Sequence, residues 1–305
     1  MNNHSVPGLS LSLVLLVGAF SQAYTQPIPQ KYSEVLNLLG KKGDFKNDVL
    51  KVNIPRNDLN VSVAGIAIPT PFGFGGWVAM TKGDQDMEVM MGDLVLLQEE
   101  VNPVMSALLE NGLEVTALHN HFFWDVPKIF YMHIHGHGNA IDLARKVAPA
   151  LNLIGIIKSE GRTASAQGSN PEVLTGKLDS EKLNRIVGKQ GEQIGPVFKF
   201  TVGREDVQLK EMGATINARM GLNTWAAFIG SDEKAAVAGD VAMLENEVTS
   251  VLKALRKNDL NVVAIHHHMT GSQPMIIFLH YWGVGPAEKL ATGFKAALDE
   301  LGKRK

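Results

Sequence analysis

The sequence predicts an α+β protein built from two tandem copies of one unit. The chain matches itself over about 125 residues at an offset of 147 or 148, which indicates a duplication. Runs of β-branched, aromatic and aliphatic residues between Gly and Pro turn signals predict mostly antiparallel strands. One apolar stripe with helical spacing occurs in each copy. We expect a β-β-β-α-β-β-α unit with its helices on one face of the sheet, and a pseudo-twofold relation between the units.

The amino-terminal region resembles an export signal. The apolar run Leu9–Phe20 is too short to span a bilayer, and Ser21-Gln22-Ala23 places small residues before a predicted cleavage site. Cleavage there predicts a periplasmic or secreted protein with no stable membrane insertion. The expected organisation is a signal peptide over 1–23, a first repeat over 24–157, a Ser- and Gly-rich linker over 158–177 and a second repeat over 178–305.

Composition limits the classes of partner. The chain has 305 residues, of which 45% are hydrophobic, and a formal net charge of −2. This is ordinary globular composition with length for two domains. The absence of a basic excess argues against a nucleic-acid partner. With no cysteine, the chain has no disulfide, no thiolate metal ligand and no cysteine for lipid attachment.

Each copy begins with a short helix followed by strands. The first helix is expected over Tyr32–Leu39, where Gly40 ends it, and its counterpart over Glu181–Val187. Predicted strands are Val49–Ile54, Val61–Ile68, Trp77–Thr81 and, in the second copy, Val197–Arg204.

A longer helix is predicted next in each copy, over Gly92–Asn111 and Gly239–Leu255. Asp93 and Asp240 then belong to helix N-termini, where the helix dipole favours an acid. Pro103 should kink the first of these helices unless its first turn starts later. A further helix is expected over Ala140–Leu151, behind a capping Asn139.

The remaining segments, Leu113–Gly138 and Leu260–Gly285, are predicted β-hairpins rich in histidine. A symmetric turn centred on Val126 puts His119 opposite His133, at a Cβ separation of about 5 Å. His121 lies two residues from His119 and therefore on the same face. His266, His268 and His280 occupy the matching positions in the second hairpin. Three imidazoles are thus expected to converge in each hairpin.

This spacing favours a divalent transition metal, Zn first and Cu or Fe as alternatives, because these ions accept neutral imidazole nitrogens and three protein ligands leave one position open. The structural alternative is a set of polar residues on a solvated sheet or histidines satisfied within a core. His135 continues the alternation in the first copy, where the second has Trp282. We therefore expect the first copy to hold the working site.

Two carboxylates are candidates for a general base. Asp125 lies in the first hairpin turn, where the second copy has Ser272, and Glu100 matches Glu247 on the long helices. A carboxylate near a bound metal can accept a proton during attack on a carbonyl or phosphoryl group. Alternatively, Asp125 hydrogen-bonds its own turn backbone and Glu100 lies on a solvated helix face.

The segment from Gly92 to Gly138, with Ala-Leu-His-Asn-His over Ala117–His121 and a later strand containing His133, resembles the repeat of the LppY/LpqO family. The second motif falls on Ala264–His268 with His280, where His267 replaces the usual Asn. The resemblance covers nearly the whole mature chain and implies a duplicated exported domain of unknown function. Several relatives are lipoproteins, but this chain lacks the cysteine that lipid attachment requires.

Three functions follow as hypotheses. The first is a metal-dependent hydrolase that acts on a small molecule or an envelope component, with the three-histidine site of the first repeat. The second is a non-enzymatic periplasmic metal carrier or sensor, and the third is a ligand-binding envelope protein with structural histidines. The chain contains no G-x-S-x-G, H-E-x-x-H or Walker-type motif, so the common hydrolase and nucleotide sites lack support.

Overall fold

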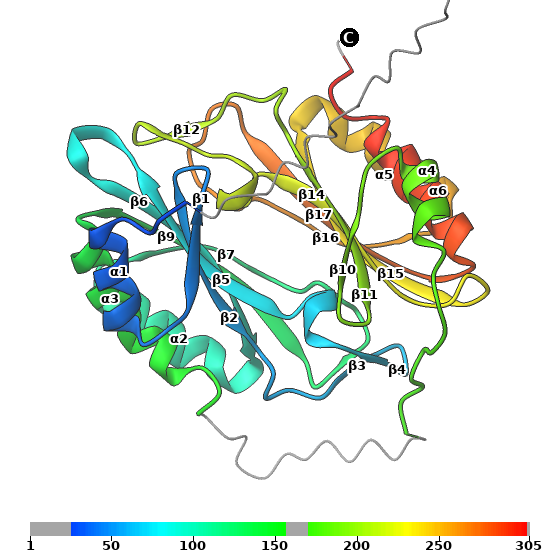
Figure 1. Ribbon diagram of the computed structural model, residues 1–305, viewed down its shortest axis with the longest axis horizontal. Helices are drawn as coiled ribbons and strands as arrows, with labels where there is room; N and C mark the ends of the chain where they lie inside the picture. Colours follow the sequence, from blue (N-terminus) through cyan, green and yellow to red (C-terminus); the bar gives the residue numbers. More distant parts are fainter. Residues whose placement is uncertain (1–25, 157–169, 304–305) are drawn as a thin grey trace, which may run out of the picture.

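The computed structural model describes residues 26–156 and 170–303, and it has four layers. Two six-stranded sheets face each other, and each sheet carries helices on its outer side (Figure 1). Each sheet with its helices is one repeat. The predicted signal peptide lies outside the described residues, as does most of the predicted linker.

The first sheet has the strand order β1-β2-β5-β6-β9-β7, and its neighbours are all antiparallel. Its strands are β1 (Gly43–Lys46), β2 (Val49–Pro55), β5 (Gly75–Lys82), β6 (Glu88–Leu97), β7 (Glu114–His119) and β9 (Ile129–Gly138). Its helices are α1 (Gln30–Leu39), α2 (Gln98–Glu110) and α3 (Ala140–Leu153). Three short strands form a separate small sheet: β3 (Val61–Val63), β4 (Ile66–Ile68) and β8 (Asp125–Val126).

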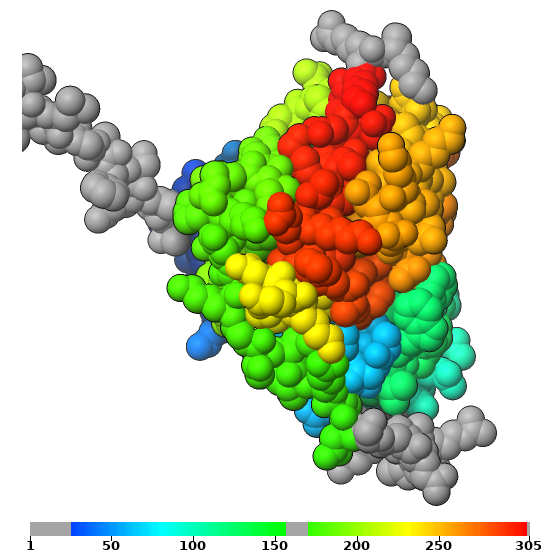
Figure 2. Space-filling model, turned by 90° about the vertical axis from the view of Figure 1, so that its right-hand side faces the viewer, coloured from blue at the N-terminus to red at the C-terminus, as the bar shows by residue number. Residues whose placement is uncertain are grey.

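The second sheet repeats this plan in the order β10-β11-β14-β15-β17-β16. Its strands are β10 (Glu192–Ile194), β11 (Val197–Gly203), β14 (Asn223–Gly230), β15 (Ala235–Leu244), β16 (Asn261–His266) and β17 (Ile276–Gly285). Its helices are α4 (Ser180–Val187), α5 (Val248–Lys257) and α6 (Ala287–Leu298). A small hairpin joins β12 (Lys210–Glu211) to β13 (Ala214–Thr215). Figure 2 looks onto the outer side of this repeat, where α5 and α6 (orange and red) lie side by side.

Apolar side chains join the four layers. One cluster lies between the first sheet and its helices, and an equivalent cluster lies between the second sheet and its helices. Two further clusters join the inner faces, one around Tyr131 and Trp282 and the other around Met91 and Phe278. Burial of apolar area on this scale is the main favourable contribution to folding. The two repeats therefore share a core, and polar groups between the inner faces are shielded from water.

The α+β class, the antiparallel sheets and the placement of helices on one face are confirmed, but the predicted unit order is wrong. Each repeat starts with a helix and has four strands of the main sheet before its second helix. Residues 92–97 and 239–244, which we expected to be helical, are strand. Both strands are buried on both faces, so their apolar residues match a helical stripe as well as an alternating strand. Consequently Asp93 and Asp240 lie within strands rather than at helix N-termini.

The hairpin register differs from the prediction by two residues. His133 pairs with Ala117, and His119 pairs with Tyr131. The cause is the connection: β8 pairs with β3 instead of forming a symmetric turn, and a bulge lies between Val115 and Ala117. Because a shift of two preserves the side-chain face, the histidines still lie on one side of the sheet.

Candidate metal centre

The same row of residues crosses each sheet on its inner face. In the first sheet the row is Asn53, Trp77, Asp93, His133 and Ala117, and in the second it is Thr201, Trp225, Asp240, His280 and Ala264. Side chains directly opposite one another in neighbouring strands share a face. Each histidine of the row therefore has a carboxylate on the adjacent strand.

Six histidines from both repeats form one cluster between the sheets. The three shortest contacts between the repeats have ring centroids 3.6 Å apart for His119–His266, 3.6 Å for His121–His280 and 3.8 Å for His133–His268. Thr116 of β7 also donates a hydrogen bond of 2.6 Å to the carbonyl oxygen of His268. The expectation of a separate three-histidine site in each hairpin is therefore wrong.

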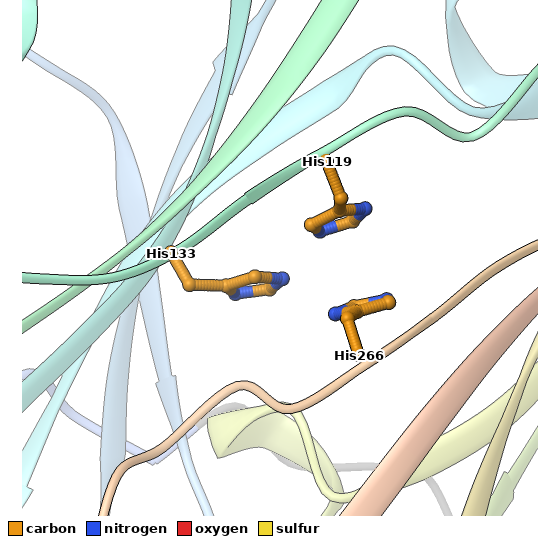
Figure 3. A group of neighbouring side chains, drawn as sticks. All are labelled: His119, His133 and His266. Atoms are coloured by element: carbon orange, nitrogen blue, oxygen red, sulfur yellow. The ribbon is translucent and has the colours of Figure 1, made fainter.

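Three groups within the described residues bring ligand atoms within 4.8 Å of one another. They are His119, His133 and His266; His119, His121 and His280; and Asp240, His266 and His280. The first is drawn in Figure 3, where the three imidazoles point toward a common space from β7, β9 and β16. Two of the groups combine both repeats and the third belongs to the second repeat, so none is the first-repeat site that we expected.

Burial keeps these imidazoles neutral. Loss of water lowers the pKa of His119 to about 4 and that of His266 to about 2. The pKa values of His121, His133, His268 and His280 fall well below the usual value, first through burial and then mainly through the neighbouring histidines. A neutral imidazole has a nitrogen lone pair that a metal ion can accept.

The hydrogen bonds select which nitrogen is free. The Nδ1 atoms of His119, His266 and His280 lie 3.3–3.4 Å from backbone carbonyl oxygens, which accept a hydrogen bond when Nδ1 carries the proton. The Nε2 atoms of all six histidines are buried and have no hydrogen-bond partner among the described residues. A buried polar atom without a partner destabilises a fold by about 1–3 kcal/mol. Six such atoms in one cluster match the donor set of a transition metal.

Two carboxylates that we had placed on helices belong to this site. Asp240 is buried and lies 3.9 Å from both His268 Nε2 and His280 Nδ1. Its equivalent Asp93 has a buried Oδ1 atom without a partner in the described chain. Burial raises the pKa of Asp93 to about 7 and that of Asp240 well above its usual value. Their match at the repeat offset of 147 residues was the sequence signal that could have singled them out, because strands buried on both faces show no alternation.

The predicted base Glu100 has structural partners instead. Its two oxygens accept hydrogen bonds from the Arg56 guanidinium at 2.6 and 3.1 Å, and from the backbone N–H groups of Leu97 and Gly155. Glu247 has the equivalent contacts with Arg204. Each ion pair anchors a helix start to a strand end. The alternative that Glu100 lies on a solvated helix face is therefore wrong as well.

Asp125 is likewise engaged in local contacts. It is buried, pairs with the Lys128 ammonium at 2.7 Å and accepts a hydrogen bond of 2.7 Å from the backbone N–H of Ile129. These contacts agree with the turn alternative rather than with a free base. His135 shares the sheet face of His133, but its nitrogens lie 3.8 Å from Glu114 and 3.7 Å from Glu211, and it is in none of the three candidate groups.

A pocket of about 550 Å³ opens beside the cluster. His121, His268 and His280 line it together with both aspartates. It is also lined by equivalent pairs from the two repeats, Lys51 with Lys199 and Trp77 with Trp225. Sequence reasoning missed the two lysines, although they match at the same offset. A larger pocket of about 920 Å³ next to Ile229 has no histidine or carboxylate among the described residues that line it.

The comparisons with known proteins identify the repeat. A family model described as Domain of Unknown Function (DUF1259) matches twice, over residues 33–153 and 181–300. This confirms a duplicated domain of unknown function, while the resemblance to the LppY/LpqO family stays a prediction. No curated protein matches the chain. Among the described residues, no helix has the length and apolar character needed to cross a membrane.

Two of three similar solved structures are described as microcompartment shell proteins. A double-ringed trimeric shell protein from the RMM microcompartment has a TM-score of 0.18 at 10% identity, covering 72% of this chain and 84% of that one. EtuB from Clostridium kluyveri has a TM-score of 0.19 at 8% identity, covering 85% and 90%. The trimeric shell protein PduB has a TM-score of 0.20 at 10% identity, covering 83% and 88%. Scores this low carry no argument about function.

Proposed function

This chain belongs to the family described as Domain of Unknown Function (DUF1259), and because that description assigns no activity, we propose a function from the site itself: the protein binds a divalent transition-metal ion between its two repeats. The observation that carries the proposal is the convergence of six neutral imidazoles whose Nε2 atoms are buried without partners in the described residues.

The ligand chemistry favours Zn, with Cu and Fe as the alternatives to test. All three ions accept imidazole nitrogen, and the chain has no cysteine to offer a softer ligand. The candidate groups each supply three ligands, which leaves a fourth position open in a tetrahedral site. Backbone carbonyls beside the Nδ1 atoms orient the rings as metal-site partners do.

A pseudo-twofold relation between the repeats accounts for the pattern of contacts. His119 meets its own equivalent His266, while the contact of His121 with His280 has its counterpart in that of His133 with His268. An axis between His119 and His266 would exchange these contacts. We infer that duplication created the site by placing one face of the unit against a copy of itself.

Hydrolysis is the activity that the surroundings of the cluster favour. The pocket is lined by His121, His268 and His280, so a small molecule can approach one side of the cluster, which a closed structural metal site does not need. Asp93 replaces Asp125 and Glu100 as the candidate base, because it lines this pocket and its Oδ1 atom has no partner in the described chain. The substrate would be a small molecule or an envelope component that enters the pocket, and the periplasmic or secreted location remains a prediction.

A metal carrier or sensor is the second candidate function. Six histidines exceed the four ligands of one tetrahedral ion, and the three candidate groups overlap. Overlapping ligand sets suit an ion that is passed on, because exchange can proceed one ligand at a time.

Metal content tests the main proposal. We expect purified untagged protein, analysed by inductively coupled plasma mass spectrometry after dialysis, to retain about one metal ion per chain. His119→Ala and His266→Ala should each weaken metal binding about 10-fold or more, since each residue belongs to two candidate groups. His137→Ala and His267→Ala are matched controls, because both histidines are exposed. Equal metal content in all four variants, or none in the parent protein, contradicts the proposal.

Turnover separates the two candidate functions. A metal-dependent hydrolase should cleave members of an ester, amide and phosphate panel and lose activity in Asp93→Asn while keeping its metal. A carrier should show no turnover and should transfer its metal to a micromolar chelator within seconds to minutes.

A further inference from the structure

We propose that the pocket beside the histidine cluster binds a small oxyanion, a carboxylate or phosphate group, between the ammonium groups of Lys51 and Lys199. This inference deepens the proposed function and rests on it for the role of the anion as part of a substrate. The lysine pair is the feature that would hold that substrate.

The two lysines are placed as an equivalent pair on the inner faces. Lys51 lies on β2 and Lys199 on β11, at matching positions of the two repeats. Both are partly buried in the wall of the pocket. Neither has a hydrogen bond or an ion pair with any residue in the described part of the chain, which is unusual for a lysine withdrawn from water.

Aromatic rings hold the lysine side chains in position. The Lys51 ammonium lies 4.3 Å from the ring centroid of Trp77, and the Lys199 ammonium lies 4.5 Å from that of Trp225. A cation over an aromatic face is attracted to it without giving up its hydrogen-bond donors to a charged acceptor. The three donors of each ammonium therefore remain available to a ligand in the pocket.

The charges in the pocket favour an anion. Burial is the main cause that lowers the pKa of Lys51 to about 8; the positive charges of Arg219 and Lys199 add to it, and the carboxylates of Asp93 and Asp44 oppose it. An anion between Lys51 and Lys199 offsets the effect of the second positive charge. Arg219 also lines the pocket, but its guanidinium already pairs with Asp44, and the acidic residues of the lining are Asp93, Asp240 and Glu192.

The size and position of the pocket define the ligand class. A volume of about 550 Å³ accommodates a small organic molecule, and the lysines and the histidines His121, His268 and His280 line the same space. A molecule held through a carboxylate or phosphate at the lysines can thus extend toward the histidine cluster. The two tryptophans provide flat apolar surfaces for the remainder of such a molecule.

Anion binding tests this inference directly. Inorganic phosphate and malonate are titrated by calorimetry into the full chain in two forms. One form is loaded with Zn, and the other has been treated with a chelator. We expect at least one anion to bind, and Lys51→Met or Lys199→Met to weaken that binding about tenfold each, the loss typical of one charge-assisted hydrogen bond. Methionine keeps the length of the side chain, and circular dichroism verifies that the variants are folded. Lys82→Met is the matched control, because Lys82 is an exposed lysine paired with Asp86 on the surface.

The outcomes are separable from those of the metal proposal. Tighter binding of phosphate than of malonate identifies phosphate as the preferred group, and the reverse identifies carboxylate. Lysine-dependent binding in a protein that retains no metal supports the anion site and defeats the metal site. A metal-loaded protein that binds neither anion, or that binds them equally well in Lys51→Met, Lys199→Met and Lys82→Met, overturns the anion site alone.

Discussion

At the scale of single residues, Lys51 lowers the stability of the fold, and its proposed role in anion binding explains why it is there. Its pKa of about 8 lies below the value of about 10.4 for a lysine in an unfolded chain, chiefly because of burial. The folded state therefore disfavours the ammonium form. A residue that lowers stability while pointing into a pocket is typical of a functional site rather than of a structural one.

We expect Lys51→Met to raise the free energy of unfolding by about 1–3 kcal/mol at pH 7. Below pH 8 the lysine is charged in both the folded and the unfolded state. The folded state therefore carries the full free-energy cost of burying the ammonium group. Between about pH 8 and 10.4 the unfolded state binds more protons, and the stability of the parent protein rises with pH toward that of the variant. Urea unfolding at pH 7 and pH 10 measures the free energy of unfolding of the parent protein and of the variant. A variant that is less stable at pH 7 would mean that the contact with Trp77 outweighs the loss of water.

At the scale of secondary-structure elements, the equivalent ion pairs fix where strand becomes helix. Arg56 extends from the end of β2, donates to the carbonyl oxygen of Val95 in β6 and pairs with Glu100 in the first turn of α2. Both partners are buried. This contact gives β6 and α2 a defined junction at Leu97, and the sequence periodicity did not reveal it.

Glu100→Ala should therefore destabilise the fold rather than impair chemistry. The substitution leaves the Arg56 guanidinium buried without this partner, an effect of about 3–5 kcal/mol. We expect a lower urea midpoint with unchanged metal content per folded chain. Glu99→Ala is the control, because the neighbouring Glu99 is exposed. Normal stability with lost turnover would restore Glu100 as a base.

At the scale of the whole molecule, the packing of the inner faces determines whether a site exists. Trp282 occupies the position equivalent to His135 and contacts Phe72 and Phe122 of the first repeat edge to face, at centroid distances of 6.0 and 5.7 Å. It is almost fully buried. The tryptophan at this position of the second copy thus adds an apolar contact between the repeats.

Trp282→Ala should remove this contact and lower the stability of the whole molecule. A large-to-small substitution of a buried tryptophan lowers stability by about 3–5 kcal/mol, or roughly 10 °C in the thermal midpoint of a chain of this length. Differential scanning calorimetry should show one lowered transition, because the repeats share a core. Trp124→Ala, at a half-exposed tryptophan, should change the midpoint little. Two separated transitions in the parent protein would contradict a shared core.

The sequence by itself determined the duplication, the α+β class and the sheet face that carries the histidines. These follow from local periodicity and from a repeat offset, and a side chain's face survives even a register error of two residues. The tertiary structure decided which histidines meet, because contacts such as His119–His266 join positions 147 residues apart and depend on how two sheets pack. It also decided that Asp93 and Asp240 lie in the site and that Glu100 is structural. Strands buried on both faces lack the alternation that would have distinguished them from a helix.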